Sequence, residues 1–204
     1  MPPFETASYL LIVWALVGYL LGSIPFGIVL SRVFGLGNLR DIGSGNIGAT
    51  NVLRTGNKAA AALTLILDGA KGAIAVLLAR SFAGGEDAVQ IAALMAMLGH
   101  CFPVWLGFRG GKGVATFLGT LIALSWPVGI GCCLAWLVAA AMTRMSSMGA
   151  LVAAATSTML MVALAQSPMV ILGVLLTTLV FVRHHENIRR IRAGTEPKIG
   201  QKTA

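Results

Sequence analysis

Charged residues are scarce in this sequence. Only 11% of the 204 residues are Asp, Glu, Lys or Arg, whereas a soluble domain carries about 25%. Hydrophobic residues make up 57% of the chain, and the mean hydropathy is +0.86. The chain has too few charged residues to cover a surface that faces water. We therefore expect lipid to be its main solvent. The length leaves room for one transmembrane domain over residues 1–204.

Acidic residues are fewer than basic ones, with 7 Asp and Glu against 15 Lys and Arg, which gives a net charge of +8. In membrane proteins, Lys and Arg gather in the loops that face the cytoplasm. The excess is therefore no sign of nucleic-acid binding by itself, and we expect no nucleic-acid partner.

Cysteine is also rare, and a basic N-terminus is missing. The three cysteines lie in apolar stretches without a CxxC pair, which predicts buried thiols and no disulfide framework. Residues 1–6 contain neither Lys nor Arg, unlike the start of a secretory signal. We therefore interpret the first apolar segment as a true membrane span.

Long apolar runs are what the sequence does have. A hydrocarbon core of about 30 Å needs roughly 20 apolar residues per helix. The segment 114–142 is too long for one straight helix, and Ser125-Trp126-Pro127 divides it, because proline disfavours helix in the residue before it. The sequence thus predicts an all-α integral membrane protein with seven transmembrane helices: 8–31, 59–78, 88–106, two short helices within 114–142, 148–165 and 170–182.

The distribution of basic residues tests this topology. Seven spans place the segments 32–58, 107–113, 144–147 and 183–204 on one side, and 13 of the 15 Lys and Arg residues lie in them. The positive-inside rule then predicts an external N-terminus and a cytoplasmic C-terminus. A site built from these segments would lie at the cytoplasmic membrane face, and the protein would be a multi-pass protein of the bacterial cytoplasmic membrane.

The first polar segment contains Gly-Ser-Gly-Asn-Ile-Gly-Ala-Thr-Asn-Val-Leu-Arg at 43–54. It matches GxGxxG, but the dinucleotide fingerprint needs a preceding strand, and none is predicted. The glycines still allow a tight turn with free N–H groups that favour an anion. Ser44, Asn46, Thr50 and Asn51 add hydrogen-bonding groups, and Arg54 can bind a phosphate with two hydrogen bonds. The alternative is an ordinary interfacial turn.

The second polar segment ends in Gly-Gly-Lys-Gly at 110–113. It is no Walker A loop, because Lys112 is followed by Gly113 and not by Ser or Thr. It nevertheless places a cation at the positive end of a predicted helix. A basic loop that extends to the membrane surface is the alternative, and it fits Arg109 better than Lys112. For His100, inside the preceding span, we expect a structural hydrogen bond to the backbone.

The third segment follows the last span. On a continuing helix, His184 and Asn187 share one face and can reach one ligand, with Arg190 close by. A basic tail that binds anionic headgroups is the alternative. Within the second span, Asp68 and Lys71 stand three residues apart, and we expect them to neutralise each other as a structural pair. No cluster completes a metal-ligand set, so we expect no metal.

Together, these motifs resemble the bacterial acyl-phosphate:glycerol-3-phosphate acyltransferase family. The matching blocks also include Gly-His-x-x-Pro-Val-x-x-Gly-Phe-x-Gly-Gly-Lys-Gly-Val-Ala-Thr at 99–116, Arg-His-x-x-Asn-Ile-x-Arg from Arg183, and Asp68-x-x-Lys71-Gly72. The resemblance implies transfer of a fatty acyl group from acyl phosphate to the 1-hydroxyl of glycerol 3-phosphate, which gives lysophosphatidic acid and phosphate, the first step of phospholipid synthesis.

The resemblance also implies site residues. Catalytic roles are expected for Ser44, His184 and Asn187, and substrate or phosphate binding for Asn46, Thr50, Arg54, Lys112, Ser147, Arg190 and Glu196. The expected partners are acyl phosphate, glycerol 3-phosphate and membrane lipids, with no cofactor and no obligate protein partner. Because acyl phosphate is already activated, we expect direct attack by the glycerol hydroxyl without an acyl-enzyme.

Three other functions compete with this interpretation. A transporter of a small phosphorylated solute would place its site at the bilayer midplane between internal repeats, and no repeat is visible. A CDP-alcohol phosphotransferase would need further aspartates near Asp68 to hold metal. A non-catalytic lipid-binding scaffold would not need three separate donor-rich segments.

Overall fold

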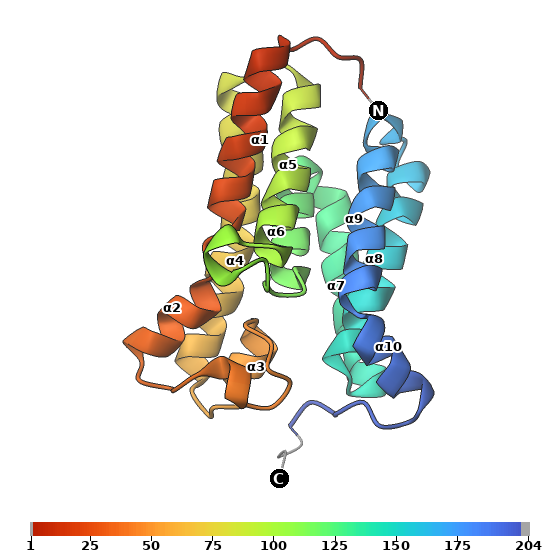
Figure 1. Ribbon diagram of the computed structural model, residues 1–204. Coiled ribbons are helices and arrows are strands. Elements are labelled where there is room, and N and C mark those ends of the chain that lie inside the picture. Colours follow the sequence, from red (N-terminus) through yellow and green to blue (C-terminus); the bar gives the residue numbers. More distant parts are fainter. Residues whose placement is uncertain (1, 201–204) are drawn as a thin grey trace.

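The chain runs back and forth along one axis as a bundle of helices (Figure 1). The computed structural model describes residues 2–200. Over these residues the elements are α1 (Ser8–Gly22), α2 (Phe26–Val33), η1 (Leu39–Asp41), α3 (Ala49–Leu53), α4 (Lys58–Phe82), α5 (Glu86–Cys101), η2 (Val104–Leu106), α6 (Val114–Leu124), α7 (Trp126–Thr143), α8 (Ser146–Ala163), η3 (Ser167–Met169), α9 (Val170–Arg183) and α10 (His185–Arg192).

The number of membrane spans agrees with the sequence prediction in part. Within residues 2–200, five helical segments are long and apolar enough to cross a membrane, and a sixth, α9 with α10, is bent by 61°. The remaining predicted span, the first short helix of the segment 114–142, is α6, whose 11 residues extend only about 16 Å, half of a hydrocarbon core. The break at Ser125 is confirmed, since α7 begins at Trp126 with Pro127 in its first turn.

Small residues bring α1 and α5 into close contact. A Cβ added at Gly22 would lie 2.0 Å from the Ala96 carbonyl oxygen, and one at Gly18 would lie 2.4 Å from that of Ala92. Such spacing of small residues lets helix backbones approach closely in lipid. Because α5 ends at Cys101, within the matching block 99–116 (the second motif), this contact helps to fix the position of that motif.

The outer surface of the bundle suits lipid. Large apolar side chains such as Phe82, Met142 and Met159 are more than 70% exposed. Their number and spread would make a water-soluble surface unstable. The protein is therefore a multi-pass membrane protein with an all-helical fold.

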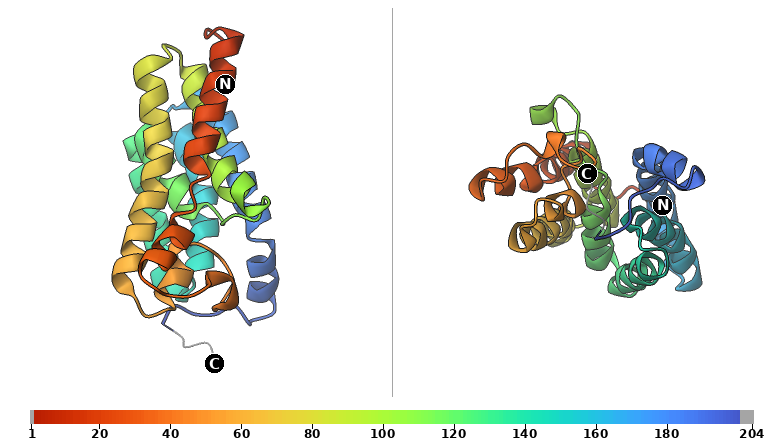
Figure 2. Two further views of the ribbon diagram at one scale, coloured as in Figure 1. Left: turned by 60° about the vertical axis from the view of Figure 1, so that its left-hand side comes forward. Right: turned by 90° about the horizontal axis from the view of Figure 1, so that it is seen from below.

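The two ends of the bundle differ in chemistry. The N-terminus lies at one end, while α2, α3, α10 and the described C-terminal segment gather at the other (Figures 1 and 2). At the N-terminal end, the Asp87 carboxylate accepts hydrogen bonds from the Glu5 and Thr6 backbones at 2.9 Å. At the same end, Arg80 donates to the Ala123 and Leu124 carbonyls that finish α6. The polar segments between the spans build the opposite end.

Candidate active site

A cavity of about 920 Å³ opens within the polar half of the molecule. All three sequence motifs contribute to its wall, together with the start of α8 and the segment after α10. Its polar lining comprises Ser44, Asn46, Thr50, Asn51, Arg54, Asp68, His100, Lys112, Ser146, Ser147, His184, Asn187, Arg190, Glu196 and Lys198. Every predicted catalytic or binding residue therefore lies in one cavity, although the seven binding candidates come from distant parts of the chain.

Asn51 organises the first motif. Its side chain, 1% exposed, donates hydrogen bonds to the carbonyls of Leu39 at 3.0 Å and Asn46 at 2.8 Å. Its Oδ1 accepts from the Ser44 backbone N–H at 3.1 Å and lies 3.4 Å from Ser44 Oγ and from Arg54 Nη1. One amide thus holds the loop closed and positions both a hydroxyl and a guanidinium at the cavity.

Thr50 joins the first motif to the start of α8. Its Oγ1 lies 3.1 Å from Ser146 Oγ, and the next residue, Ser147, donates to Glu196 Oε1 at 2.6 Å. These hydroxyls bring the remaining basic segment, 144–147, to the cavity, next to the other three.

The second motif forms a tight turn before α6. The N–H groups of Gly110 and Gly111 donate to the carbonyls of Cys101 and His100, each at 3.1 Å. Gly113 then caps α6 with φ +81°, a left-handed conformation that glycine adopts without strain. The turn directs Lys112 into the cavity, where Nζ donates to Asn187 Oδ1 at 2.5 Å.

The third motif contains a break, so the last span does not continue through it as one straight helix. α9 ends at Arg183 and α10 leaves at 61°. His184, at the break, places Nδ1 2.8 Å from the Val180 carbonyl. A carbonyl oxygen only accepts hydrogen bonds, so Nδ1 carries the proton and Nε2 of the neutral ring is left as an acceptor. His184 and Asn187 still reach the same cavity, as predicted.

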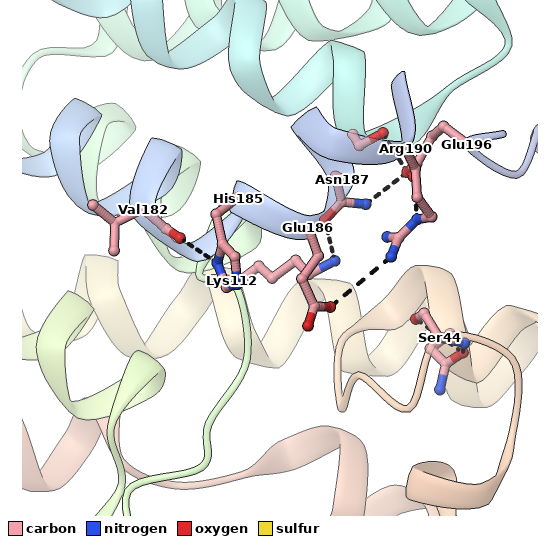
Figure 3. A network of polar contacts seen from close by, with 10 residues as sticks. Ser44, Lys112, Val182, His185, Glu186, Asn187, Arg190 and Glu196 are labelled. Carbon is pink, nitrogen blue, oxygen red and sulfur yellow. Dashed lines mark hydrogen bonds and ion pairs between the residues drawn. The ribbon is translucent and has the colours of Figure 1, made fainter. Parts of the chain in front are cut away.

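Glu196 connects three of the predicted residues (Figure 3). Its Oε1 accepts from Ser147 and from Asn187 Nδ2, each at 2.6 Å, and its Oε2 accepts from Arg190 Nε at 2.7 Å. Since Lys112 also binds Asn187, one chain of contacts runs from the second motif to the segment after α10. In the same view, Ser44 lies on a separate loop.

Burial and neighbouring charges set the protonation states in this cavity. Burial, followed by the charge of Arg190, lowers the pKa of Lys112 to about 8. Burial likewise lowers the pKa of His184 to about 4. For Glu196, burial acts to raise the pKa, but hydrogen bonds led by that from Ser147 outweigh it and lower the pKa. Near neutral pH, the site therefore presents a cationic Lys112, a neutral His184 and an ionised Glu196.

The intramembrane pair has an additional partner. Lys71 Nζ lies 2.9 Å from Asp68 Oδ1 and donates to the Ile24 carbonyl at 2.7 Å. His100 Nδ1 lies 3.7 Å from the same Asp68 oxygen. The expected pairing is present, but His100 faces Asp68 and the cavity, which differs from the backbone bond that we predicted for its ring.

Two residues that the sequence motifs did not single out also shape the site. Asn51 was one donor among several, yet it is the centre of its loop. Arg183 donates from Nε to the Gly111 carbonyl and from Nη2 to the Gly110 carbonyl, each at 3.1 Å. Arg183 could have been noticed in the sequence, since it is the first residue of the third matched block. The contact of Arg183 with the second motif depends on the bend after α9.

Comparison with known proteins decides the family. The family model described as glycerol-3-phosphate acyltransferase matches residues 12–194. The chain belongs to the glycerol-3-phosphate acyltransferase family. Among curated family members, the glycerol-3-phosphate acyltransferase of Ruegeria pomeroyi is 67% identical over the full length of both chains. That of a Cereibacter sphaeroides strain is 65% identical over all of this chain and 97% of its own.

Solved structures of the same family support the fold. The chain resembles the crystal structure of PlsY (YgiH), described as an integral membrane glycerol 3-phosphate acyltransferase, in its glycerol 3-phosphate form. The TM-score is 0.88 at 36% identity, over 93% of this chain and 96% of that one. The lysophosphatidic acid form of PlsY gives 0.84 at 34% identity, over 93% and 95%. The membership predicted from the motifs is confirmed, and with it an acyltransferase role in lipid biosynthesis.

Proposed function

We propose that this protein transfers a fatty acyl group from acyl phosphate to the 1-hydroxyl of glycerol 3-phosphate, giving lysophosphatidic acid and phosphate. The observation that carries the proposal is one cavity with two kinds of wall. Cationic and hydrogen-bonding residues line its polar part, while Leu65, Leu118, Trp136 and Leu137 from α4, α6 and α7 line another. Such a cavity suits two phosphates and one acyl chain.

The cations of the cavity are assigned to the phosphates. Lys112, Arg54 and Arg190 reach it from three different segments, so they can neutralise two phosphate groups at once. Four further residues complete the polar part of the cavity. The Asn46 amide and the Thr50 and Ser147 hydroxyls serve as hydrogen-bond partners of the substrates, and the fourth residue is Glu196. Glu196 holds Asn187 and Arg190 in place.

Ser44, His184 and Asn187 are assigned to the reacting groups. Nε2 of His184 can accept a hydrogen bond from the glycerol 1-hydroxyl because Nδ1 is committed to Val180. Asn187 Nδ2 and Ser44 Oγ are donors suited to the acyl carbonyl oxygen, on which negative charge develops. These groups would act by orientation and charge stabilisation.

The proposed reaction is a single displacement at the acyl carbon. The hydroxyl oxygen of glycerol 3-phosphate forms a bond to the carbonyl carbon, and the bond from that carbon to the phosphate oxygen breaks. The electron pair leaves on phosphate, and the hydroxyl proton also ends there. Burial lowers the pKa of His184, which favours a phosphate oxygen over this ring as the final proton acceptor.

The membrane orientation is part of the proposal. The polar end carries the basic segments, so it would face the cytoplasm of a bacterial cytoplasmic membrane, with the N-terminus outside. Glycerol 3-phosphate would enter from water, while the acyl chain of the donor stays in lipid.

A donor-exchange assay tests the proposal. Purified protein in detergent should form lysophosphatidic acid from acyl phosphate and glycerol 3-phosphate, releasing one phosphate per product. Acyl-CoA should not replace acyl phosphate as donor. Product from acyl-CoA alone would contradict the donor assignment, and a covalent acyl–Ser44 species in a single turnover would contradict direct attack.

The same assay separates the enzyme from a transporter. Detergent leaves no compartment, so a transporter would not consume the two substrates. The polar residues gather at one end of the bundle, whereas a transporter site lies near the midplane.

A further inference from the structure

Arg183 stands outside the set of residues assigned to the substrates, although it contacts the second motif. It is the last residue of α9, and its guanidinium binds two consecutive carbonyls, Gly110 and Gly111, at 3.1 Å each. Its guanidinium carbon also lies 5.1 Å from the centre of the Phe102 ring, close enough for a cation–π contact. The planar fork of arginine makes this double contact possible, and lysine cannot reproduce it.

In the turn that Arg183 contacts, the backbone N–H and carbonyl groups of Gly110 and Gly111 all have partners. The N–H groups of Gly110 and Gly111 bind the end of α5, and their carbonyls bind Arg183. Both glycines are buried, and a Cβ at Gly111 would lie 2.2 Å from His100 Nε2. The turn is thus held between α5 and α9, and losing Arg183 would leave two buried carbonyls without these partners.

Lys112 follows this turn directly and closes a second link between the same elements. Its Nζ binds Asn187 on α10, one helix beyond Arg183. The second and third motifs are therefore joined twice, once by Arg183 to the backbone and once by Lys112 to Asn187. A displacement of the turn would move the Lys112 ammonium away from Asn187.

We propose that Arg183 is a positioning residue for the acyl transfer: by binding the Gly110 and Gly111 carbonyls, it sets the place of Lys112 against the substrate phosphate. The inference rests on the proposed function only for its kinetic readout. Arg183 also acts on Lys112 by charge. The charged groups that influence the pKa of Lys112, after burial itself, are Arg190, Glu196, Glu186 and Arg183, and His184 is close enough to be affected by Lys112 in turn.

Two substitutions separate geometry from charge. Arg183→Lys keeps the charge but loses the double contact, so kcat/KM for glycerol 3-phosphate should fall at least tenfold, as expected for the loss of hydrogen bonds from a charged group. Arg183→Gln loses both, and should in addition move the alkaline limb of the pH profile to higher pH, because one positive charge near Lys112 is gone. Arg189→Gln, an exposed position on α10, is the matched control and should behave as the wild type.

Chemical labelling of Lys112 tests the influence of Arg183 without any enzyme turnover. The pH dependence of Lys112 labelling by an amine-reactive reagent, read by mass spectrometry, should move to higher pH in Arg183→Gln and stay unmoved in Arg189→Gln. Wild-type kinetics in Arg183→Lys would overturn the positioning role, and wild-type labelling in Arg183→Gln would overturn the charge effect on Lys112. An inactive wild type would contradict the proposed function alone, because the labelling shift would still be measured.

Discussion

At the scale of single residues, Lys112 is the cation on which the proposed function depends most directly. Lys112→Ala should lower kcat/KM about a hundredfold, the usual effect of removing one group that stabilises transition-state charge. Lys112→Arg should keep part of the activity, since the charge remains. Lys58→Ala removes an exposed lysine outside the cavity and serves as the control; full activity in Lys112→Ala would remove this residue from the site.

The titration of Lys112 gives the activity a pH limit. The pKa is lowered to about 8, first by burial, so Lys112 is cationic below pH 8 and becomes neutral above it. We expect kcat/KM for glycerol 3-phosphate to fall as the pH rises through about 8. A bound phosphate stabilises the cation, so the corresponding fall in kcat should lie at higher pH. Coincident limbs would contradict contact between Lys112 and the phosphate.

Asn51 should be sensitive to an isosteric change. Asn51→Asp places a carboxylate opposite the Leu39 and Asn46 carbonyls, which now accept from Nδ2, and acceptors facing acceptors repel. Unsatisfied buried groups cost about 1–3 kcal/mol each, so thermal unfolding should occur several degrees lower and activity should fall.

Asn57→Asp is the matched control for this change. Asn57 caps α4 by accepting from the Ala60 N–H, and aspartate caps equally well. An Asn51→Asp protein as stable and active as Asn57→Asp would show that the amide is not the organiser of the loop.

At the scale of elements, the sequence predicted local chemistry better than local geometry. Pro127 predicted the start of α7, because proline restricts the backbone of the residue directly before it. The division at Ser125 also makes α6 short, with 11 residues. The sequence did not show how closely α6 packs against α4. There, a Cβ on Gly119 would lie 2.2 Å from the Gly69 carbonyl oxygen.

The bend after α9 could not be predicted from the residues around it. Nothing in the residues near His184 breaks a helix, yet α10 turns by 61°. Lys112 then binds Asn187, and Glu196 binds both Asn187 and Arg190. The residues of the third motif were therefore predictable from their types, while the role of Arg183 was not. It depends on the position of a turn more than 70 residues earlier.

The contact between α1 and α5 should not tolerate a larger side chain. Gly22→Val would place carbon atoms on the Ala96 backbone, where a Cβ already lies 2.0 Å from oxygen. Overpacking costs about 1–3 kcal/mol, and the helices cannot separate without moving the second motif at the end of α5. We expect a lower unfolding temperature and reduced activity, measured in detergent, whereas Leu20→Val, at a half-exposed position on the same helix, should change neither.

At the scale of the whole molecule, the distribution of charge along the sequence matches the arrangement of the two ends of the bundle. The described chain places its N-terminal segment and the α4–α5 connection at one end and the basic motifs at the other (Figure 1). This separation was predictable from the sequence because 13 of 15 Lys and Arg residues lie in four segments. Placing these basic segments on the opposite side would require moving their charge across the bilayer.

Cysteine labelling tests which end faces the cytoplasm. Glu5→Cys and Arg192→Cys introduce thiols at exposed positions at the two ends of the bundle. A membrane-impermeant maleimide should label Glu5→Cys in right-side-out vesicles and Arg192→Cys only in inverted ones. The unmodified chain sets the background: Cys101 and Cys132 are buried, while Cys133 is partly buried and lines the cavity. Labelling of Arg192→Cys from outside would reverse the proposed orientation and place the glycerol 3-phosphate entrance away from the cytoplasm, and labelling of both thiols from one side would exclude an odd number of crossings.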